Sequence, residues 1–442
     1  MTAEIAIMNR EAVALAADSA VTVSGRKSCK SCGQKTYKIY NSDSKLFRLS
    51  EFAPVGVMTY GTADLTGVPW ETIIKSFRRE LGDERLPHLR EYADRLIAYI
   101  NGNKFMFSEE LQESQLDNSV SVLFQMILDD TSIKSSNVRA IKMESARKII
   151  QEVHSEWTSK ERLAGIPASH AQRIRQKWQD RIENRIDSDF QELLPIDSET
   201  RGRLIDIACL LFTVDDFLLD DSSGVVVAGF GEEEYLPSVV SFDTEGFLLD
   251  FVKYKVNEEQ SASFPPAAII PFAQQDMVHH FIRGIHPLFW PKIRHELRQF
   301  TADLAAANAP CAEQIKQAGE ALENQFVERL SAYSWEGHTW PVISAVEYLP
   351  KDELAVMAES LVNLTSFKYR VTQDAETVGG PIDVAVISKG DGFIWINRKN
   401  YFEPALNHLD FRRFRRRVAR RLPRPAGGRR FPGVLAGRGE MP

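Results

Sequence analysis

The sequence predicts an α+β fold in which two sheets carry helices on their outer faces. Segments with strand-like patterns gather in three groups, within residues 4–60, 224–247 and 381–396. Two helical segments and a long, highly charged helical stretch separate the first group from the second, and further helices precede the last strands. This order does not alternate strand and helix strictly, as a chain of βαβ units would.

The composition restricts the class of protein. The chain has 442 residues, 43% apolar, 26% charged and 10% aromatic, which allows a sizeable core and excludes disorder of the whole chain. No apolar run approaches the roughly 18 residues that a membrane span needs, and residues 1–23 lack the basic-then-apolar order of a signal peptide. We therefore expect a cytoplasmic protein with no membrane partner.

The net charge of −7 is unevenly distributed. Residues 411–442 contain eleven Arg and one Glu, a balance of about +10, so the remaining body carries about −17 (−7 minus +10). An acidic body argues against nucleic acid as the principal partner. We expect residues 401–442 to form a basic, disordered tail, with docking on an acidic neighbouring subunit and binding of a polyanion as the alternatives.

The first 64 residues are dominated by strand patterns. Residues 4–7 and 13–17 predict two strands joined by a turn at residues 9–11, and a third strand begins at residue 21. The polar, Ser/Gly-rich residues 25–35 predict a loop. Two more strands follow, and they cover residues 45–49 and 55–60.

Helices follow these strands. Pro69 suits a first helical turn, and an apolar face behind it comprises Trp70, Ile73, Ile74, Phe77 and Leu81. A second helix is expected over residues 86–100, and residues 105–200 are mostly helical. Within that stretch a narrow apolar stripe, expected to pack on the body or on another subunit, comprises Ile174, Trp178, Ile182 and Ile186.

In the second half of the sequence, strands are followed by helices and then by two more strands. Strands are expected at residues 224–230 and 239–247, the latter with a turn at residues 243–246. Helices then cover residues 274–330, with breaks near Pro287 and Pro310, and residues 352–364. The last regular elements are strands at residues 381–387 and 392–396, joined by a Lys-Gly-Asp-Gly turn.

The residues with the most specific chemistry stand at the beginning of the chain. Met1 is followed by Thr2, and a small second residue allows removal of the methionine, which would free the Thr2 amine. An N-terminal threonine carries a nucleophilic hydroxyl and an amine with a pKa near 8 that can take its proton. This chemistry also needs a cation beside the threonine and a carboxylate to fix the cation. Lys45 and Asp18 are the candidates.

At these positions the sequence resembles the β-subunits of proteasomes and the bacterial two-component proteasome-like peptidase. The opening TAEIAIMNREAVALAADS, residues 2–19, has the family's spacing from the threonine to Asp18. Residues 45–64, KLFRLSEFAPVGVMTYGTAD, resemble the lysine-led strand and the Gly-x-x-Asp segment that follows it. The segments WETIIKSFRREL, VVVAGFGEEEYLPSVVSFDTEGF and ETVGGPIDVAVI are similar to later family elements, so that the resemblance covers about half of the chain.

The resemblance implies a four-layer αββα sandwich of the N-terminal nucleophile (Ntn) hydrolase class. Residues 1–100 and 224–400 would form its two halves, and residues 101–223 a helical insertion. It also implies a cytoplasmic hydrolase, a threonine protease or other peptidase, that assembles into oligomers or rings, which an ATP-dependent unfoldase could feed. No cofactor or metal is expected.

The site implied by the resemblance departs from the family at several positions. About eleven extra residues separate Asp18 from Lys45, so that Lys38 is an alternative for the lysine. Tyr60 and Gly61 stand where the oxyanion hole is expected. Asp374 and Glu376 lie near the late acidic position of the family.

Four further positions bear on the prediction. Gln274 and Val378 stand where serines support the family's threonine, so the supporting residues are altered. Cys29 and Cys32 form one CxxC, which is half of a zinc site and more simply a loop with two thiols.

Three functions follow from the sequence. The first is a threonine-type peptidase or amidohydrolase in which Thr2 attacks the amide of a peptide substrate after removal of Met1. The second is a non-catalytic, proteasome-like structural subunit, and the third is an amidase of the same fold that acts on small molecules.

Overall fold

The computed structural model describes residues 2–28, 35–40, 44–130, 139–193, 195–217, 222–263, 265–372 and 378–400. For residues 22–28, 35–39 and 192 it describes the backbone alone. The chain up to Arg398 forms one compact unit. This unit mixes helices with antiparallel sheets, as the predicted α+β class requires.

Two five-stranded antiparallel sheets form the centre of the unit. The first has the strand order β12-β1-β2-β13-β14, with bounds Ala267–Ala273, Ala3–Asn9, Ala12–Ala17, Asp383–Ser388 and Gly392–Asn397. The second has the order β11-β10-β9-β6-β5, with bounds Phe251–Ser261, Ser238–Leu248, Ser223–Gly229, Val55–Gly61 and Leu46–Arg48. Two small hairpins pair β3 (Val21–Ser28) with β4 (Lys35–Tyr40) and β7 (Asp64–Leu65) with β8 (Val68–Pro69).

The two large sheets face each other across a shared apolar core. Ala6 and Leu15 of the first sheet belong to the same buried cluster as Met58 and Val226 of the second. Alternate residues of β1, such as Ile5, point to the opposite face of their sheet, as the two-residue period of a strand requires. Both faces of β1 are therefore covered, and all seven of its residues are buried.

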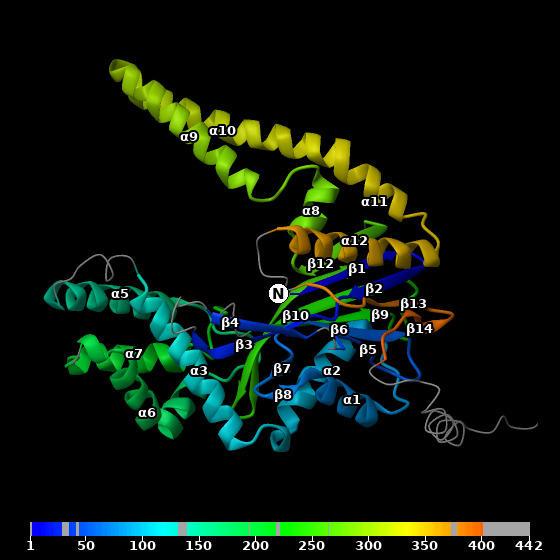
Figure 1. Cartoon of the computed structure of the whole chain (residues 1–442), viewed down its shortest axis with the longest axis horizontal. Helices are drawn as coiled ribbons and strands as arrows, with labels where there is room; N and C mark the ends of the chain where they lie inside the picture. The colour runs from blue at the N-terminus through cyan, green and yellow to red at the C-terminus, as the bar shows by residue number, and fades with distance from the viewer. Residues whose placement is uncertain are drawn as a thin grey trace, which may run out of the picture. The chain divides into compact units, whose positions relative to one another are not determined.

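Helices cover the outer face of each sheet (Figure 1). On the second sheet these are α1 (Trp70–Leu81) and α2 (Leu89–Gly102). The predicted apolar face of α1 is entirely buried there. On the first sheet α8 (Asp276–Arg283) and α12 (Lys351–Val371) share a core with the outward residues of β1, β2 and β13.

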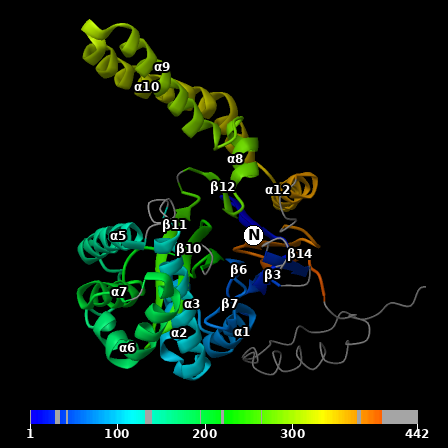
Figure 2. The same cartoon turned by 60° about the vertical axis from the view of Figure 1, so that its left-hand side comes forward.

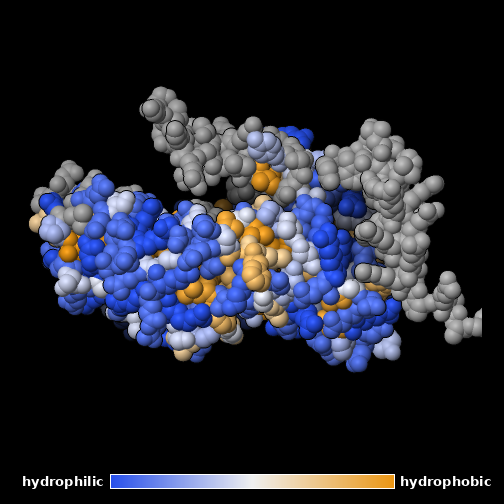
Figure 3. Space-filling view, turned by 90° about the horizontal axis from the view of Figure 1, so that it is seen from below, coloured by the Kyte–Doolittle hydropathy of each residue, from blue (hydrophilic) through white to orange (hydrophobic). Residues whose placement is uncertain are grey.

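A separate group of helices lies between α2 and β9 in the sequence. It comprises α3 (Glu109–Leu128), α5 (Arg139–Ser159), α6 (His170–Asp189) and α7 (Ser198–Leu210), which share their own apolar core. The predicted stripe of α6, from Ile174 to Ile186, is buried in that core. The solvent faces of α5 to α7, at the left of Figure 3, are mainly hydrophilic.

A pair of long helices extends beyond the sheets (Figure 2). Helices α9 (Phe289–Ala307) and α10 (Ala312–Ser334) are held together by Glu323, which accepts hydrogen bonds from Arg294 and Arg298. A π-helical turn, Trp335–Thr339, leads into α11 (Trp340–Val346) and back to α12. The predicted breaks near Pro287 and Pro310 lie at the ends of α9.

Two local predictions were wrong. Residues 243–246 do not form a turn, because β10 continues through them to Leu248. An irregularity in the β10–β11 pairing accommodates Gly246, whose φ is +81°. The loop expected at residues 25–35 was wrong at both ends, since β3 extends to Ser28 and β4 begins at Lys35; residues 29–34 lie outside the described residues. The basic tail, residues 401–442, and the CxxC of Cys29 and Cys32 lie outside the described residues.

Candidate active site

Thr2 directly precedes β1 and is almost fully buried, with 3% of its surface exposed. Its carbonyl oxygen accepts a hydrogen bond of 3.1 Å from the backbone N–H of Gln274, directly after β12. The backbone of Ala3 pairs with Ala273 in the β1–β12 register. These contacts fix the backbone of Thr2 and therefore the position of its hydroxyl.

Asp18 and Lys45 meet beside Thr2. Asp18 follows β2, and its Oδ1 accepts hydrogen bonds from Lys45 Nζ and, at 3.3 Å, from the backbone N–H of Ala3. Its other oxygen accepts a bond of 3.0 Å from the N–H of Gly379. Lys45, 4% exposed, is anchored through its carbonyl oxygen, which accepts a 2.8 Å bond from the N–H of Thr59. The structure thus brings together three residues that are spread over 43 positions of the sequence, from Thr2 to Lys45.

Glu4 joins this cluster, although the sequence analysis did not single it out. Its Oε2 accepts a hydrogen bond of 3.0 Å from Thr2 Oγ1, and its Oε1 lies 3.2 Å from Lys45 Nζ. Residues two apart on a strand point to the same face, so the position of Glu4 in the first strand was the signal that could have identified it. The cluster of Thr2, Glu4, Asp18 and Lys45 is called the threonine cluster below.

The pKa values of Glu4 and Lys45 depend on their burial and on the neighbouring charges. Burial raises the pKa of the Glu4 carboxyl from its ordinary 4.5 to about 8; the ammonium of Lys45 opposes the shift and the charge of Asp18 adds to it. For Lys45, burial lowers the pKa, but the carboxylates of Glu4 and Asp18 outweigh it and raise the pKa above 10.5. Lys45 is therefore charged at neutral pH, while Glu4 exchanges its proton close to that range.

Gly61, at the end of β6, presents its backbone N–H to the Thr2 hydroxyl, with 3.5 Å between Gly61 N and Thr2 Oγ1. Gly61 has a φ of +81°, and a Cβ on it would lie 2.5 Å from the carbonyl oxygen of Ser222. Both the left-handed backbone and the close approach require glycine. A backbone donor at this distance from a hydroxyl can stabilise an oxyanion that forms beside that hydroxyl.

The side chain of Tyr60 is held in the core between the sheets. Its hydroxyl donates a 2.8 Å hydrogen bond to Asp243 Oδ1, and its ring stacks on Phe272 with 5.5 Å between centroids. Burial raises its pKa, with the charge of Asp243 as the next cause. The ring also covers Gly224 of β9, where an added Cβ would lie 1.8 Å from the Tyr60 ring.

This packing gives a prediction for Gly224→Ala. The new methyl group must displace the Tyr60 ring, which is fixed at both ends, so we expect a loss of about 1–3 kcal/mol in the free energy of unfolding. Gly202→Ala is the matched control, because this glycine lies within α7 with no atom near its missing Cβ. There we expect a gain of about 0.5–1 kcal/mol. Urea unfolding measures both; equal stability of Gly224→Ala and the wild type would contradict the packing described.

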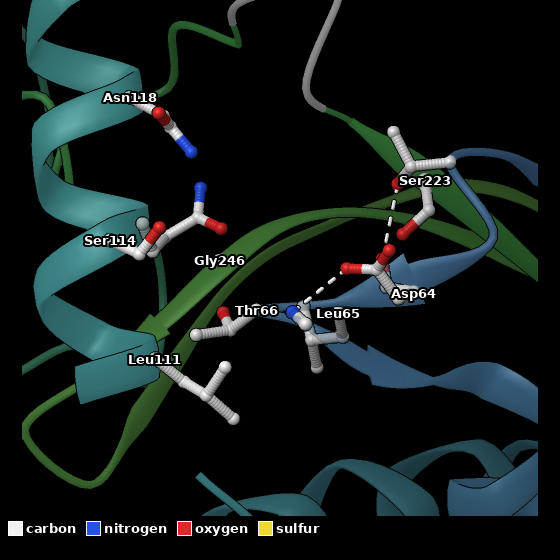
Figure 4. A pocket seen from close by; sticks show the side chains of 11 residues that line it. Asp64, Leu65, Thr66, Leu111, Ser114, Asn118, Ser223 and Gly246 are labelled. Carbon is white, nitrogen blue, oxygen red and sulfur yellow. Dashed lines mark hydrogen bonds between the residues drawn. The ribbon is translucent and has the colours of Figure 1, made fainter. Parts of the chain in front are cut away.

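A polar cavity of about 250 Å³ is lined by Thr62, which directly follows Gly61 in the chain, and by the residues shown in Figure 4. Its walls come from the segment after β6 and from one face of α3, with the side chains of Thr62, Asp64, Thr66, Ser114, Gln115 and Asn118. Among the lining residues, all of which are described, Asp64 alone is charged. Its Oδ1 accepts a 2.8 Å hydrogen bond from the N–H of Gly67, which orders this segment.

Other residues considered in the sequence analysis lie outside the threonine cluster or outside the described residues. Asp374 and Glu376 lie outside the described residues. Lys38, the alternative lysine, lies on β4 opposite Val23, and its side chain is not described. Gln274, which replaces a serine of the resembled family, accepts a hydrogen bond from Tyr369 of α12 through Oε1.

The described residues contain no group of three His, Cys, Asp or Glu that could hold a metal ion. None of their helices is long and apolar enough to cross a membrane.

The comparisons with known proteins give no assignment. No family model matches the sequence, and a search of the curated proteins finds no match.

Proposed function

We propose that this chain is an amide or peptide hydrolase of the Ntn class, with Thr2 as the nucleophile once Met1 has been removed. The observation that supports this most directly is the position of the Thr2 hydroxyl, which lies beside a buried charged cluster and a backbone N–H donor. Thr2 Oγ1 lies beside the Glu4–Lys45–Asp18 charges and 3.5 Å from the Gly61 N–H. A nucleophile, a fixed cation and an oxyanion donor are the parts that acyl transfer needs.

The architecture supports the same proposal. Two facing antiparallel sheets, each covered on its outer side by helices, have the layer order of the αββα sandwich of Ntn hydrolases. Thr2 directly precedes a strand of the first sheet, and Gly61 ends a strand of the second. The proposed active site therefore lies at one end of the interface between the two sheets.

The proposed reaction is an acyl transfer through a threonine ester. Thr2 Oγ1 attacks the amide carbonyl, and the developing oxyanion is stabilised by the Gly61 N–H. Lys45, fixed by Asp18, stabilises the negative charge that develops on the hydroxyl oxygen. The resemblance assigns the hydroxyl proton to the Thr2 amine, which would return it to the leaving amine. Water then hydrolyses the ester.

The cavity lined by Thr62 would receive part of the substrate. Its hydroxyl and amide groups and the Asp64 carboxylate suit a polar or cationic group better than a large apolar one. Oligomers or rings, and an unfoldase partner, stay predictions of the resemblance.

Turnover of amides by the purified chain tests the proposal. We expect hydrolysis of members of a peptide library or a small-amide panel, with loss of this activity after treatment with a β-lactone, which acylates nucleophilic hydroxyls. Preference for the library or the panel separates a peptidase from a small-molecule amidase. Absence of turnover in both, or turnover that the lactone does not affect, would favour the non-catalytic subunit.

A further inference from the structure

We propose that Glu4 is a catalytic residue that takes the proton of the Thr2 hydroxyl and delivers it to the leaving amine. This inference rests on the proposed function and adds to it a base that does not depend on the threonine amine. It follows from the geometry of the threonine cluster, from the way its charges are shared and from the burial of Glu4.

The geometry places the carboxylate of Glu4 between the nucleophile and the cation. Oε2 accepts the hydrogen bond of Thr2 Oγ1 at 3.0 Å, which is within the distance needed for direct proton transfer. Oε1 lies 3.2 Å from Lys45 Nζ. The Glu4 side chain has no exposed surface. Glu4 lies on β1, which is hydrogen-bonded on either side, and Thr2 directly precedes this strand with its carbonyl oxygen bonded to the N–H of Gln274, so the spacing of Thr2 and Glu4 is fixed.

The two carboxylates of the cluster are not equivalent. Asp18 is held by Lys45 and by the backbone N–H groups of Ala3 and Gly379. Glu4 is held by Lys45 and by the Thr2 hydroxyl, whose proton it can accept. A single ammonium therefore serves two buried carboxylates, and of these two only Glu4 contacts the nucleophile.

The protonation of Glu4 supports a role in proton exchange. Burial raises its pKa to about 8, against the attraction of Lys45 and together with the charge of Asp18. The charge of Glu4 also acts on Tyr60. Burial raises the pKa of Tyr60, so its hydroxyl stays neutral in this range. A group that gains and loses a proton near neutral pH is suited to act as base in one step and acid in the next.

The proposed steps balance in protons and bonds. As the bond between Thr2 Oγ1 and the carbonyl carbon forms, the hydroxyl proton moves to Glu4 Oε2. Glu4 then returns the proton to the substrate nitrogen as the C–N bond breaks, which releases an amine and leaves a threonine ester. Water attacks the ester while Glu4 takes a proton from the water. Cleavage of the C–O bond and return of the proton to Thr2 Oγ1 restore the enzyme.

The test compares the rate of adduct formation with a β-lactone in the wild type and in Glu4→Gln, followed by intact mass between pH 5 and pH 9. The glutamine keeps the shape but cannot accept the proton. At pH 9 we expect Glu4→Gln to react at least about 100-fold more slowly. The ratio of the two rates should fall about tenfold for each pH unit below 8, because wild-type Glu4 is then protonated and inactive as a base.

A matched control is Glu245→Gln, which removes the carboxylate of the other buried Glu–Lys pair, Glu245 with Lys253. Its adduct rate should equal that of the wild type at every pH. Equal rates in Glu4→Gln and the wild type, or a ratio that does not change with pH, would overturn the role of Glu4 and leave the proposed function intact. No adduct on the wild type at any pH would overturn both. If Glu4→Gln does not fold, Glu4→Asp, which keeps a carboxylate that can act as the base, should retain the pH dependence of the wild type.

Discussion

Replacement of Thr2 by alanine should abolish both amide hydrolysis and adduct formation while the fold is preserved. The substitution removes one hydroxyl, which donates a hydrogen bond to Glu4 and accepts one from the Gly61 N–H. It leaves the backbone bond from Gln274 to the Thr2 carbonyl in place. Without Oγ1 no ester can form, so we expect turnover to fall by at least about 10⁴-fold. The circular dichroism spectrum should not change.

The matched control is Thr301→Ala on α9, which removes a hydroxyl that donates a 2.9 Å bond to the carbonyl of Leu297. This variant should hydrolyse amides at the wild-type rate. Thr2→Ser should retain part of the activity, because it keeps the oxygen. Undiminished hydrolysis by Thr2→Ala would contradict the mechanism, since some other residue would then have to be the nucleophile.

Replacement of Lys45 by methionine should be the most destabilising single change in the threonine cluster. It removes the shared cation and leaves Glu4 and Asp18 facing each other without a charge partner. Breaking a buried ion pair from one side typically costs about 3–5 kcal/mol. The loss should be largest at high pH and should shrink as pH falls toward 4, because protonation of buried carboxyls removes the unpaired charge. Urea unfolding between pH 4 and pH 9 measures this dependence.

Lys253→Met provides the comparison for this variant. Lys253 is buried as well, but its ion pair is with one carboxylate, that of Glu245. Its removal should therefore cost less at pH 9 than removal of Lys45, and it should leave adduct formation at Thr2 unchanged. If Lys45→Met were as stable as the wild type at pH 9, the two carboxylates could not be sharing that lysine.

The elements with a regular local pattern could be predicted from the sequence. The apolar face of α1, from Trp70 to Leu81, repeats at helical spacing, and every predicted member of that face is buried. The strand Phe251–Ser261 was not among the predicted strands. It is an edge strand in which exposed charged residues such as Lys255 and Glu259 alternate with half-buried ones. When it is considered without β10, the strand that pairs with it, such a polar pattern resembles a loop.

The threonine cluster could be predicted only in part. Thr2, Asp18 and Lys45 were selected because their spacing resembles that of a family, and the fold brings them together over 43 residues of chain. Glu4 was overlooked because a glutamate in an alternating strand normally faces solvent. Here both faces of β1 are covered by other layers, and this arrangement of sheets is not visible in the local sequence.

The intact mass of the purified wild-type protein, before and after treatment with a β-lactone, is the most direct test of the proposed hydrolase. We predict a chain that has lost Met1 and that gains the mass of one lactone, at a site mapped to Thr2 by peptide sequencing. A chain that retains Met1, or that has lost it and gains no adduct, would contradict the assignment of Thr2 as an active nucleophile.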